Sequence, residues 1–274
     1  MSLLVGSFLN VVIHRLPIMM ERDWRKQAQE LLALETTADS AAQKYNLSVP
    51  RSACPHCGAQ ITALQNIPVI SWLMLKGRCA NCSARISVRY PLVELGTALL
   101  SAIVAWHFEF TAHMAAALCC TWTLIALTMI DCDHQLLPDD LTLSLLWLGL
   151  VLSLFNGAVL PITSQAAIIG AAAGYLSLWL VFHLFKALTG KEGMGYGDFK
   201  LLAALGAWLG WQMLPLIILL SACVGALVGI GMILIRGRDR NIPIPFGPYL
   251  ASAGWIAMLW GDQIVTAYLQ SLQS

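Results

Sequence analysis

Long apolar runs constrain the fold of this chain more than any other feature. A helix needs roughly 20 apolar residues to cross the hydrocarbon core of a bilayer, and several runs here approach or reach that length. Only 11% of the residues are charged, whereas about a quarter are charged in a soluble domain. The apolar runs cover residues 3–13, 91–108, 112–130, 141–160, 166–187, 201–212, 214–235 and 246–269.

These runs predict an all-α polytopic membrane protein with about eight spans. The first run is too short to cross a bilayer unless the native chain begins upstream of Met1. The 201–212 run is also short, and we expect it to form a helical hairpin with the run that follows. The sequence then divides into a short first membrane segment at 1–14, an insert at 15–90 and a multi-span domain at 91–274.

The positions of the lysine and arginine residues predict the orientation of the chain. Ten of the sixteen lie between Arg15 and Arg89, and the others form two groups of three, at 186–200 and 236–240. If the spans alternate direction, all sixteen fall on one side, which is the cytoplasmic side by the positive-inside rule. The 15–90 insert is therefore expected in the cytoplasm. For the chain as a whole we expect membrane lipid, and no nucleic acid, as a partner.

Two Cys-x-x-Cys pairs lie in this insert. Cys54 and Cys57 form the first pair, and Cys79 and Cys82 follow after a gap of 21 residues. Four thiolates at this spacing are typical of tetrahedral zinc, and Gly58 and Gly77 are expected to supply the tight turns that such knuckles need. Because all four positions are filled by sulfur, we expect a structural zinc ribbon rather than a catalytic metal.

Two other interpretations of these cysteines are less favourable. Disulfide bonds are disfavoured because thiols stay reduced on a cytoplasmic face. A redox pair of the thioredoxin type needs a βαβ context that this sequence lacks. The remaining cysteines lie in or beside apolar runs and are expected to be packing residues: Cys119, Cys120, Cys132 and Cys223.

Acidic residues at membrane depth are costly and usually functional. The candidates are Glu94, Asp131, Asp133, Asp139, Asp140, Asp198 and Asp262. Most have a structural explanation: Asp139 or Asp140 could cap a helix, Glu94 could pair with Arg89, and Asp133 and Asp262 could be solvated.

Asp198 resists such an explanation best. It follows Gly193, Gly195 and Gly197, and glycines lower the steric barrier to a close approach by another segment. Asp131 ends an apolar run on the same predicted side and is its best partner. Two such carboxyl groups can hydrolyse a peptide bond, because one activates a water molecule while the other, protonated, polarises the carbonyl.

Five motifs in order resemble the type IV prepilin peptidase family of GxGD aspartyl proteases. They are Gly6-Ser-Phe-Leu-Asn10 with His14-Arg-Leu-Pro17, the two cysteine pairs, Arg89-Tyr-Pro-Leu-Val-Glu94, Asp131-Cys-Asp-His-Gln-Leu-Leu-Pro-Asp139, and Gly195-Tyr-Gly-Asp198. The resemblance covers nearly the whole chain.

The resemblance implies a bifunctional enzyme of the bacterial inner membrane. It implies that Asp131 and Asp198 are catalytic, with Gly195, Gly197 and Lys200 supporting their loop. The substrate would be a prepilin or pseudopilin of a type IV pilus or type II secretion system, cleaved after a glycine on the cytoplasmic side. The new N-terminus would then be methylated by S-adenosylmethionine, and Gly77 matches a position linked to methylation. The same match assigns zinc to the four cysteines.

Two functions from other classes remain open at this level. A proton-coupled transporter could use Asp131 and Asp198 as a relay, but it predicts inverted repeats and acids at mid-membrane. A non-enzymatic scaffold could dock a secretion machine through the zinc ribbon. Such a scaffold would tolerate asparagine at either aspartate.

Overall fold

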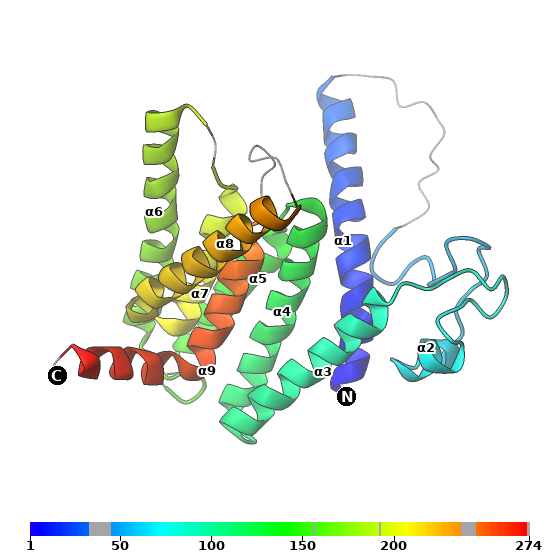
Figure 1. Ribbon diagram of the computed structural model, residues 1–274, viewed down its shortest axis with the longest axis horizontal. Helices are drawn as coiled ribbons and strands as arrows, with labels where there is room; N and C mark the ends of the chain where they lie inside the picture. Colours follow the sequence, from blue (N-terminus) through cyan, green and yellow to red (C-terminus); the bar gives the residue numbers. More distant parts are fainter. Residues whose placement is uncertain (33–44, 156, 192, 237–244, 273–274) are drawn as a thin grey trace. The chain divides into compact units, whose positions relative to one another are not determined.

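A computed structural model describes residues 1–32, 45–155, 157–191, 193–236 and 245–272. Regular structure in these residues is helical, with two isolated antiparallel bridges in the insert. The chain divides into two compact units, Met1–Ala102 and Ile103–Ser274, and each is described by itself (Figure 1). An all-helical fold with a four-cysteine cluster is confirmed. The predicted division at residues 14 and 90 stays a prediction about topology.

The first unit contains α1, a short 3₁₀ turn, α2 and the first part of α3. Their bounds are Ser2–Leu31 for α1, Leu64–Asn66 for the 3₁₀ turn, Ile70–Met74 for α2 and Arg89–Phe108 for α3.

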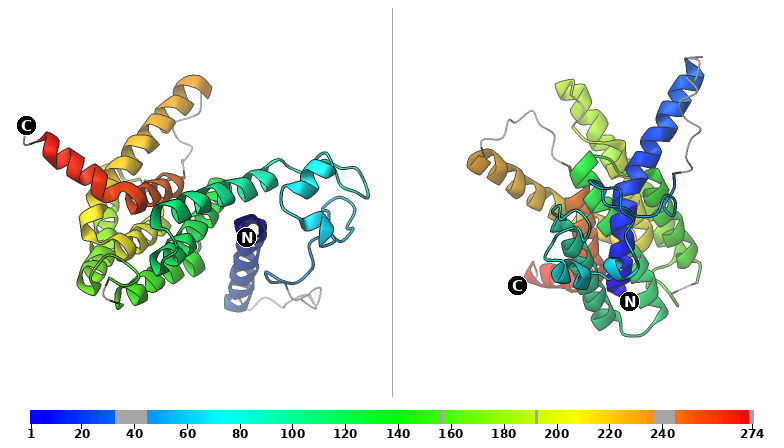
Figure 2. Two further views of the ribbon diagram at one scale, coloured as in Figure 1. Left: turned by 90° about the horizontal axis from the view of Figure 1, so that it is seen from below. Right: turned by 90° about the vertical axis from the view of Figure 1, so that its right-hand side faces the viewer.

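Helix α1 is much longer than the 3–13 apolar run indicated. It continues without a break through Pro17 and includes the polar segment from Glu21 onward (Figure 2, blue). Arg15 and Pro17 look like a helix end in the sequence, yet both side chains are buried. The Arg15 guanidinium donates to backbone carbonyls. Its charge is therefore compensated, and the helix can continue past it among apolar residues.

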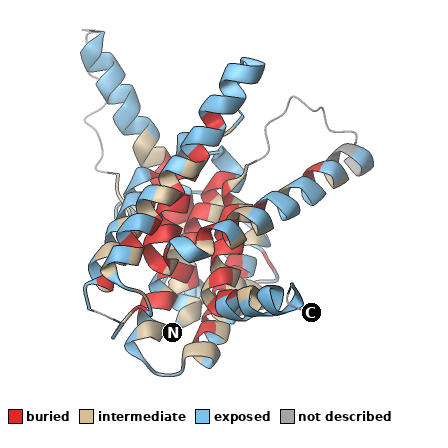
Figure 3. Ribbon diagram, turned by 90° about the vertical axis from the view of Figure 1, so that its left-hand side faces the viewer, coloured by how far each residue is buried: buried red, intermediate tan, exposed pale blue. Residues whose placement is uncertain are grey.

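The second unit is a bundle of helices around α7. Their bounds are Ala112–His134 for α4, Asp139–Ser153 for α5, Ser164–Thr189 for α6, Tyr196–Leu209 for α7, Trp211–Met213 for a 3₁₀ turn, Leu214–Arg236 for α8 and Gly247–Ser271 for α9. Helix α7 packs against α5, α6 and α9, and ten of its fourteen residues are buried. Buried residues are coloured red in Figure 3.

Small residues let α7 approach its neighbours closely. A Cβ atom on Gly174 of α6 would lie 2.6 Å from the Leu202 carbonyl oxygen, and Gly170 packs against the backbone of Gly206. On another side, the Trp208 indole donates to the Leu145 carbonyl of α5 at 2.8 Å. Close backbone packing of this kind is typical of membrane helices, where hydrophobicity alone does not drive helices together.

Five described helices are long and apolar enough to span a membrane, namely α1, α3, α4, α6 and α8. Each of the eight apolar runs contains a helix, but α5 and α7 have only 15 and 14 residues. At 1.5 Å per residue, 14 residues extend about 21 Å, which is less than the roughly 30 Å hydrocarbon core. Helix α7 is buried among longer helices, so its own length need not match the bilayer.

Candidate active site and metal centre

Asp131 lies in the last turn of α4 and is 5% exposed. Its Oδ2 accepts a hydrogen bond from the backbone N–H of Gly247, the first residue of α9, at 3.0 Å. A free N–H at a helix N-terminus favours a negatively charged acceptor. Helix α9 thus holds the Asp131 carboxylate from 116 residues away along the chain.

Asp198 lies in the first turn of α7 and is 6% exposed. Its Oδ2 accepts from the backbone N–H of Gly195, the N-cap residue, at 3.3 Å, which is one half of a capping box. Its Oδ1 is buried and has no hydrogen-bond partner among the described protein groups. A buried carboxylate oxygen in this state is costly unless it meets water or a ligand.

Leu137 brings these segments together. A Cβ atom on Gly197, next to Asp198, would lie 2.7 Å from the Leu137 Cβ, and one on Gly247 would lie 3.1 Å from its Cδ2. Gly197, before the sixth predicted span, therefore serves a close approach, as the sequence indicated, and Gly247 at the start of the last span serves a second one. Gly197, next to Asp198, and Gly247, whose N–H binds Asp131, thus pack on the same leucine side chain.

Lys200 pairs with a different carboxylate. Its Nζ lies 2.6 and 2.7 Å from the two oxygens of Asp139 in the first turn of α5. Asp139 is not a side-chain cap, because Pro138 occupies the N-cap position. This ion pair joins the N-terminal ends of α5 and α7, and the Lys200 side chain remains only 27% exposed. Its predicted role in supporting the segment that carries Asp198 stays a prediction.

The four cysteines of the insert form a cluster suited to a metal. All four Sγ atoms lie within 4.8 Å of one another, and Cys54 and Cys82 are 3.8 Å apart. A tetrahedron with metal–sulfur bonds of about 2.3 Å has sulfur–sulfur edges of about 3.8 Å. The geometry fits the donor set that the sequence predicted.

Amide donors around the cluster favour thiolates. The side-chain amide of Asn81, with the N–H of Ala59, lowers the pKa of the Cys57 thiol to about 6. The N–H groups of Cys82 and Asn81 also lower the pKa of Cys79. The N–H of Ala84 favours a thiolate at Cys82, but desolvation and the neighbouring thiols outweigh it and raise that pKa to about 11. A divalent cation offsets such repulsion between thiolates.

The two knuckles reach the same backbone conformation with different residues. Gly58 has φ of +70° and donates its N–H to the Cys54 carbonyl. Ser83 holds the equivalent place after Cys79, with φ of +59° and the same hydrogen bond. Gly77 also has a positive φ, but it precedes the second knuckle and packs on the ring of Trp72.

Similarity to known proteins accounts for nearly the whole chain. Residues 1–108 match the bacterial peptidase A24 N-terminal domain and residues 118–230 match the type IV leader peptidase family. A protein of Stutzerimonas stutzeri named prepilin leader peptidase/N-methyltransferase is 60% identical over 98% of this chain and 92% of its own length. The chain belongs to the type IV leader peptidase family.

Further relatives carry the same name at similar coverage. That of Pseudomonas aeruginosa is 60% identical over 98% of this chain and 91% of its own length, and that of Legionella pneumophila is 49% identical over 98% and 92%. No solved structure matches. Relatives named as peptidases weigh against a transporter or a scaffold, and the family expected from the five motifs is confirmed.

Two residues that the sequence did not reveal complete the acidic site of this family member. Gly247 supplies the N–H to Asp131, and Leu137 contacts the glycines beside both acids. Phe246-Gly247-Pro248 could have signalled a helix start, because proline is favoured in the first turn. A single sequence could not reveal that the N–H of Gly247 binds Asp131.

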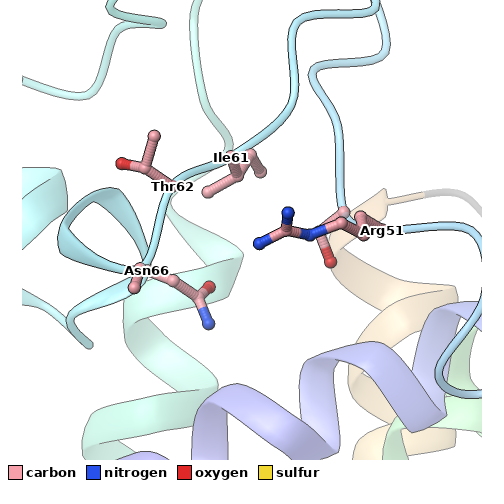
Figure 4. A pocket seen from close by; sticks show the side chains of 6 residues that line it. Arg51, Ile61, Thr62 and Asn66 are labelled. Carbon is pink, nitrogen blue, oxygen red and sulfur yellow. The ribbon is translucent and has the colours of Figure 1, made fainter.

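A cavity of about 210 Å³ lies in the insert, lined by Arg51, Ser52, Ile61, Thr62, Ala63 and Asn66. The Arg51 guanidinium points toward Ile61 and Asn66 (Figure 4). Pockets that enclose a drug-sized ligand usually measure about 300–1,000 Å³. The cavity is thus too small to enclose a whole adenosyl methyl donor.

A cysteine substitution tests the metal centre. Replacing Cys79 with serine is expected to lower bound zinc from about one ion per chain to a small fraction of that, because structural zinc needs four protein ligands. Metal analysis of purified protein measures this, and Cys223→Ser in α8 is the matched control. Fewer than one zinc per undamaged wild-type chain would contradict the assignment.

Proposed function

We propose that this chain cleaves the leader peptides of prepilins and pseudopilins, using Asp131 and Asp198, and then methylates the new N-terminal residue. The observation that supports this most is the meeting of two buried aspartates from separate helices. Each accepts one backbone N–H, and one oxygen of Asp198 has no protein partner among the described residues. A water molecule bound there would be the nucleophile.

The pair supplies an acid and a base for hydrolysis. The ionised carboxylate removes a proton from a water molecule while the oxygen of that water attacks the scissile carbonyl carbon. The protonated carboxyl group donates a hydrogen bond, and then its proton, to the carbonyl oxygen. Collapse of the tetrahedral intermediate transfers a proton to the leaving amine, which becomes the new N-terminus. Two acids that repel each other keep one proton between them, so both roles are available at once.

Membrane geometry fits a prepilin substrate. Its apolar helix lies in the bilayer, and its basic leader is held on the cytoplasmic side, where the positive-inside rule also places the insert of this chain. Asp131 and Asp198 lie at the ends of α4 and α7 rather than at helix centres. In this orientation the scissile bond and both acids occupy the cytoplasmic edge of the inner membrane.

Methyl transfer is assigned to the insert. S-adenosylmethionine is water-soluble, and the insert is the polar part of the chain. With all four sites of its tetrahedron filled by cysteines, zinc would hold the knuckles in place and would not contact the methyl donor. Gly77 matches the position that the family resemblance links to methylation, and it lies two residues before the metal ligand Cys79. A Cβ at Gly77 would lie 2.8 Å from the Trp72 ring, so a larger residue there would disturb the insert.

The test is a purified reaction with defined substrates. Detergent-solubilised protein is incubated with a prepilin or a pseudopilin, with or without S-adenosylmethionine. The masses of the products are measured by mass spectrometry. We expect loss of the leader in both conditions and gain of one methyl group only with the donor. Intact precursor after incubation with folded, zinc-loaded protein would contradict the proposal.

A further inference from the structure

The insert is joined to the first two membrane helices by contacts that neither the metal nor the aspartates use. All of them lie within the unit Met1–Ala102. On α1, the buried Arg15 donates to the Asn46 carbonyl at 2.9 Å and to the Pro50 carbonyl at 2.7 Å. A charged donor with two carbonyl acceptors makes a strong anchor, and it fixes the chain four residues before Cys54.

The second anchor is Glu94 on α3, which is 8% exposed. Its Oε2 accepts a hydrogen bond from the backbone N–H of Val69 in the insert at 2.8 Å. A Cβ on Gly6 of α1 would lie 2.7 Å from the Glu94 Cα, and Asn10 donates to the Tyr90 carbonyl at 3.1 Å. Helices α1 and α3 therefore fix the position of the Glu94 backbone.

Val69 has a strained backbone. Its φ of +60° and ψ of −50° are paired with a hydrogen bond from the Ile70 N–H to the Pro68 carbonyl at 2.5 Å. This is a γ-turn of the rare strained kind, centred on a β-branched residue for which positive φ is an outlier. Such strain persists only where surrounding contacts hold it, and the Glu94 carboxylate is the contact on the Val69 N–H.

A short path connects this turn to the second knuckle. Helix α2 begins at Ile70, and its Trp72 donates to the Ile86 carbonyl at 3.3 Å. The Trp72 carbonyl accepts from the Gly77 N–H at 2.9 Å, and Gly77 lies against the Trp72 ring. Cys79 follows two residues later. The direction in which α2 leaves the strained turn thus sets where the knuckle lies.

We propose that Glu94 is a positioning residue for methyl transfer, because its hydrogen bond to Val69 fixes the four-cysteine insert on α1 and α3. This rests on the proposed function, which assigns methyl transfer to the insert. Without the acceptor the turn at Val69 relaxes, α2 leaves it in another direction, and the methyl-transfer site no longer meets the new N-terminus. Because Asp131 and Asp198 belong to the unit Ile103–Ser274, we expect leader cleavage to be unaffected.

Three substitutions of Glu94 distinguish the effect of its hydrogen bond to Val69 from the effect of its negative charge. Glu94→Gln keeps an oxygen at the same distance but no charge, Glu94→Asp keeps the charge but is too short to reach Val69, and Glu94→Ala keeps neither. Methylation of a synthetic mature peptide and cleavage of a prepilin are measured on each full-length variant, with zinc content measured alongside.

The expected pattern is specific. Glu94→Ala and Glu94→Asp should lower kcat for methylation about tenfold or more, since small misplacements of reacting groups are costly. Their KM for S-adenosylmethionine, their cleavage rate and their zinc content should stay within about twofold of wild type, and Glu94→Gln should restore methylation.

Other results would overturn the inference. Equal methylation rates for Glu94→Ala and wild type would exclude a positioning role for Glu94. If Glu94→Gln did not restore methylation, the charge of Glu94 would matter rather than its hydrogen bond to Val69. Loss of zinc, or a parallel loss of cleavage, would assign Glu94 to folding. If the wild-type protein cleaves but never methylates, it is the proposed function that fails.

Discussion

Replacing either Asp131 or Asp198 with asparagine is expected to lower the rate of leader cleavage by about a thousandfold or more. In the proposed mechanism each carboxyl group performs a proton transfer that an amide cannot perform. Asparagine has nearly the same shape, and its side-chain oxygen can still accept from the Gly247 or Gly195 N–H. The loss should therefore come from chemistry rather than from folding, and it is measured as initial cleavage rates of a purified prepilin.

Two controls make this result interpretable. Asp140→Asn changes an exposed acid in the first turn of α5, and it should cleave at close to the wild-type rate. Both catalytic variants should still methylate a synthetic peptide that already has a mature N-terminus, which shows that they are folded. A wild-type cleavage rate for Asp131→Asn or Asp198→Asn would exclude the aspartate pair.

Replacing Gly247 with alanine is expected to reduce leader cleavage by about a hundredfold. The added Cβ would lie 2.6 Å from Oδ2 of Asp131 and 3.1 Å from Leu137. Since Leu137 already packs against Gly197, relief comes most easily by turning the Asp131 carboxyl away from its N–H donor. A displacement of about 1 Å in a reacting group is sufficient for an effect of this size.

Gly231→Ala is the matched control for this substitution. Gly231 lies in α8 and has nothing within 4 Å of an added Cβ, so alanine there should leave activity unchanged. Initial rates and thermal unfolding are measured for both variants. If Gly247→Ala cleaves as fast as Gly231→Ala at equal stability, the contact between α9 and Asp131 does not position the catalytic group.

The sequence alone was sufficient to propose which residues carry the chemistry. Asp198 stood out because glycines precede it, and the two cysteine pairs predicted a cluster whose Sγ atoms do lie within 4.8 Å. Helices at the apolar runs could be predicted because hydrophobic runs of that length have few other stable forms in a membrane. The role of each catalytic and metal residue remains a prediction.

The groups that hold those residues could not be predicted in the same way. Gly247 acts through a backbone N–H, which every residue except proline carries, so the residue type does not reveal its partner. Arg15 suggested the end of a span because its charge is visible in the sequence, while the carbonyls that satisfy it are not. The hydrogen bond of Glu94 to Val69 crosses 25 residues and involves a backbone N–H, so the sequence did not indicate it.

The shortness of α7 has a consequence for how the protein is made. A segment of 14 residues does not remain stably in a bilayer by itself, so it must enter the membrane together with α8 after the turn at Gly210, where φ is +79°. The donor to Asp131 comes from α9, which leaves the ribosome later still. In the proposed mechanism, leader cleavage therefore awaits the insertion of α9, because only then does Asp131 gain the N–H of Gly247.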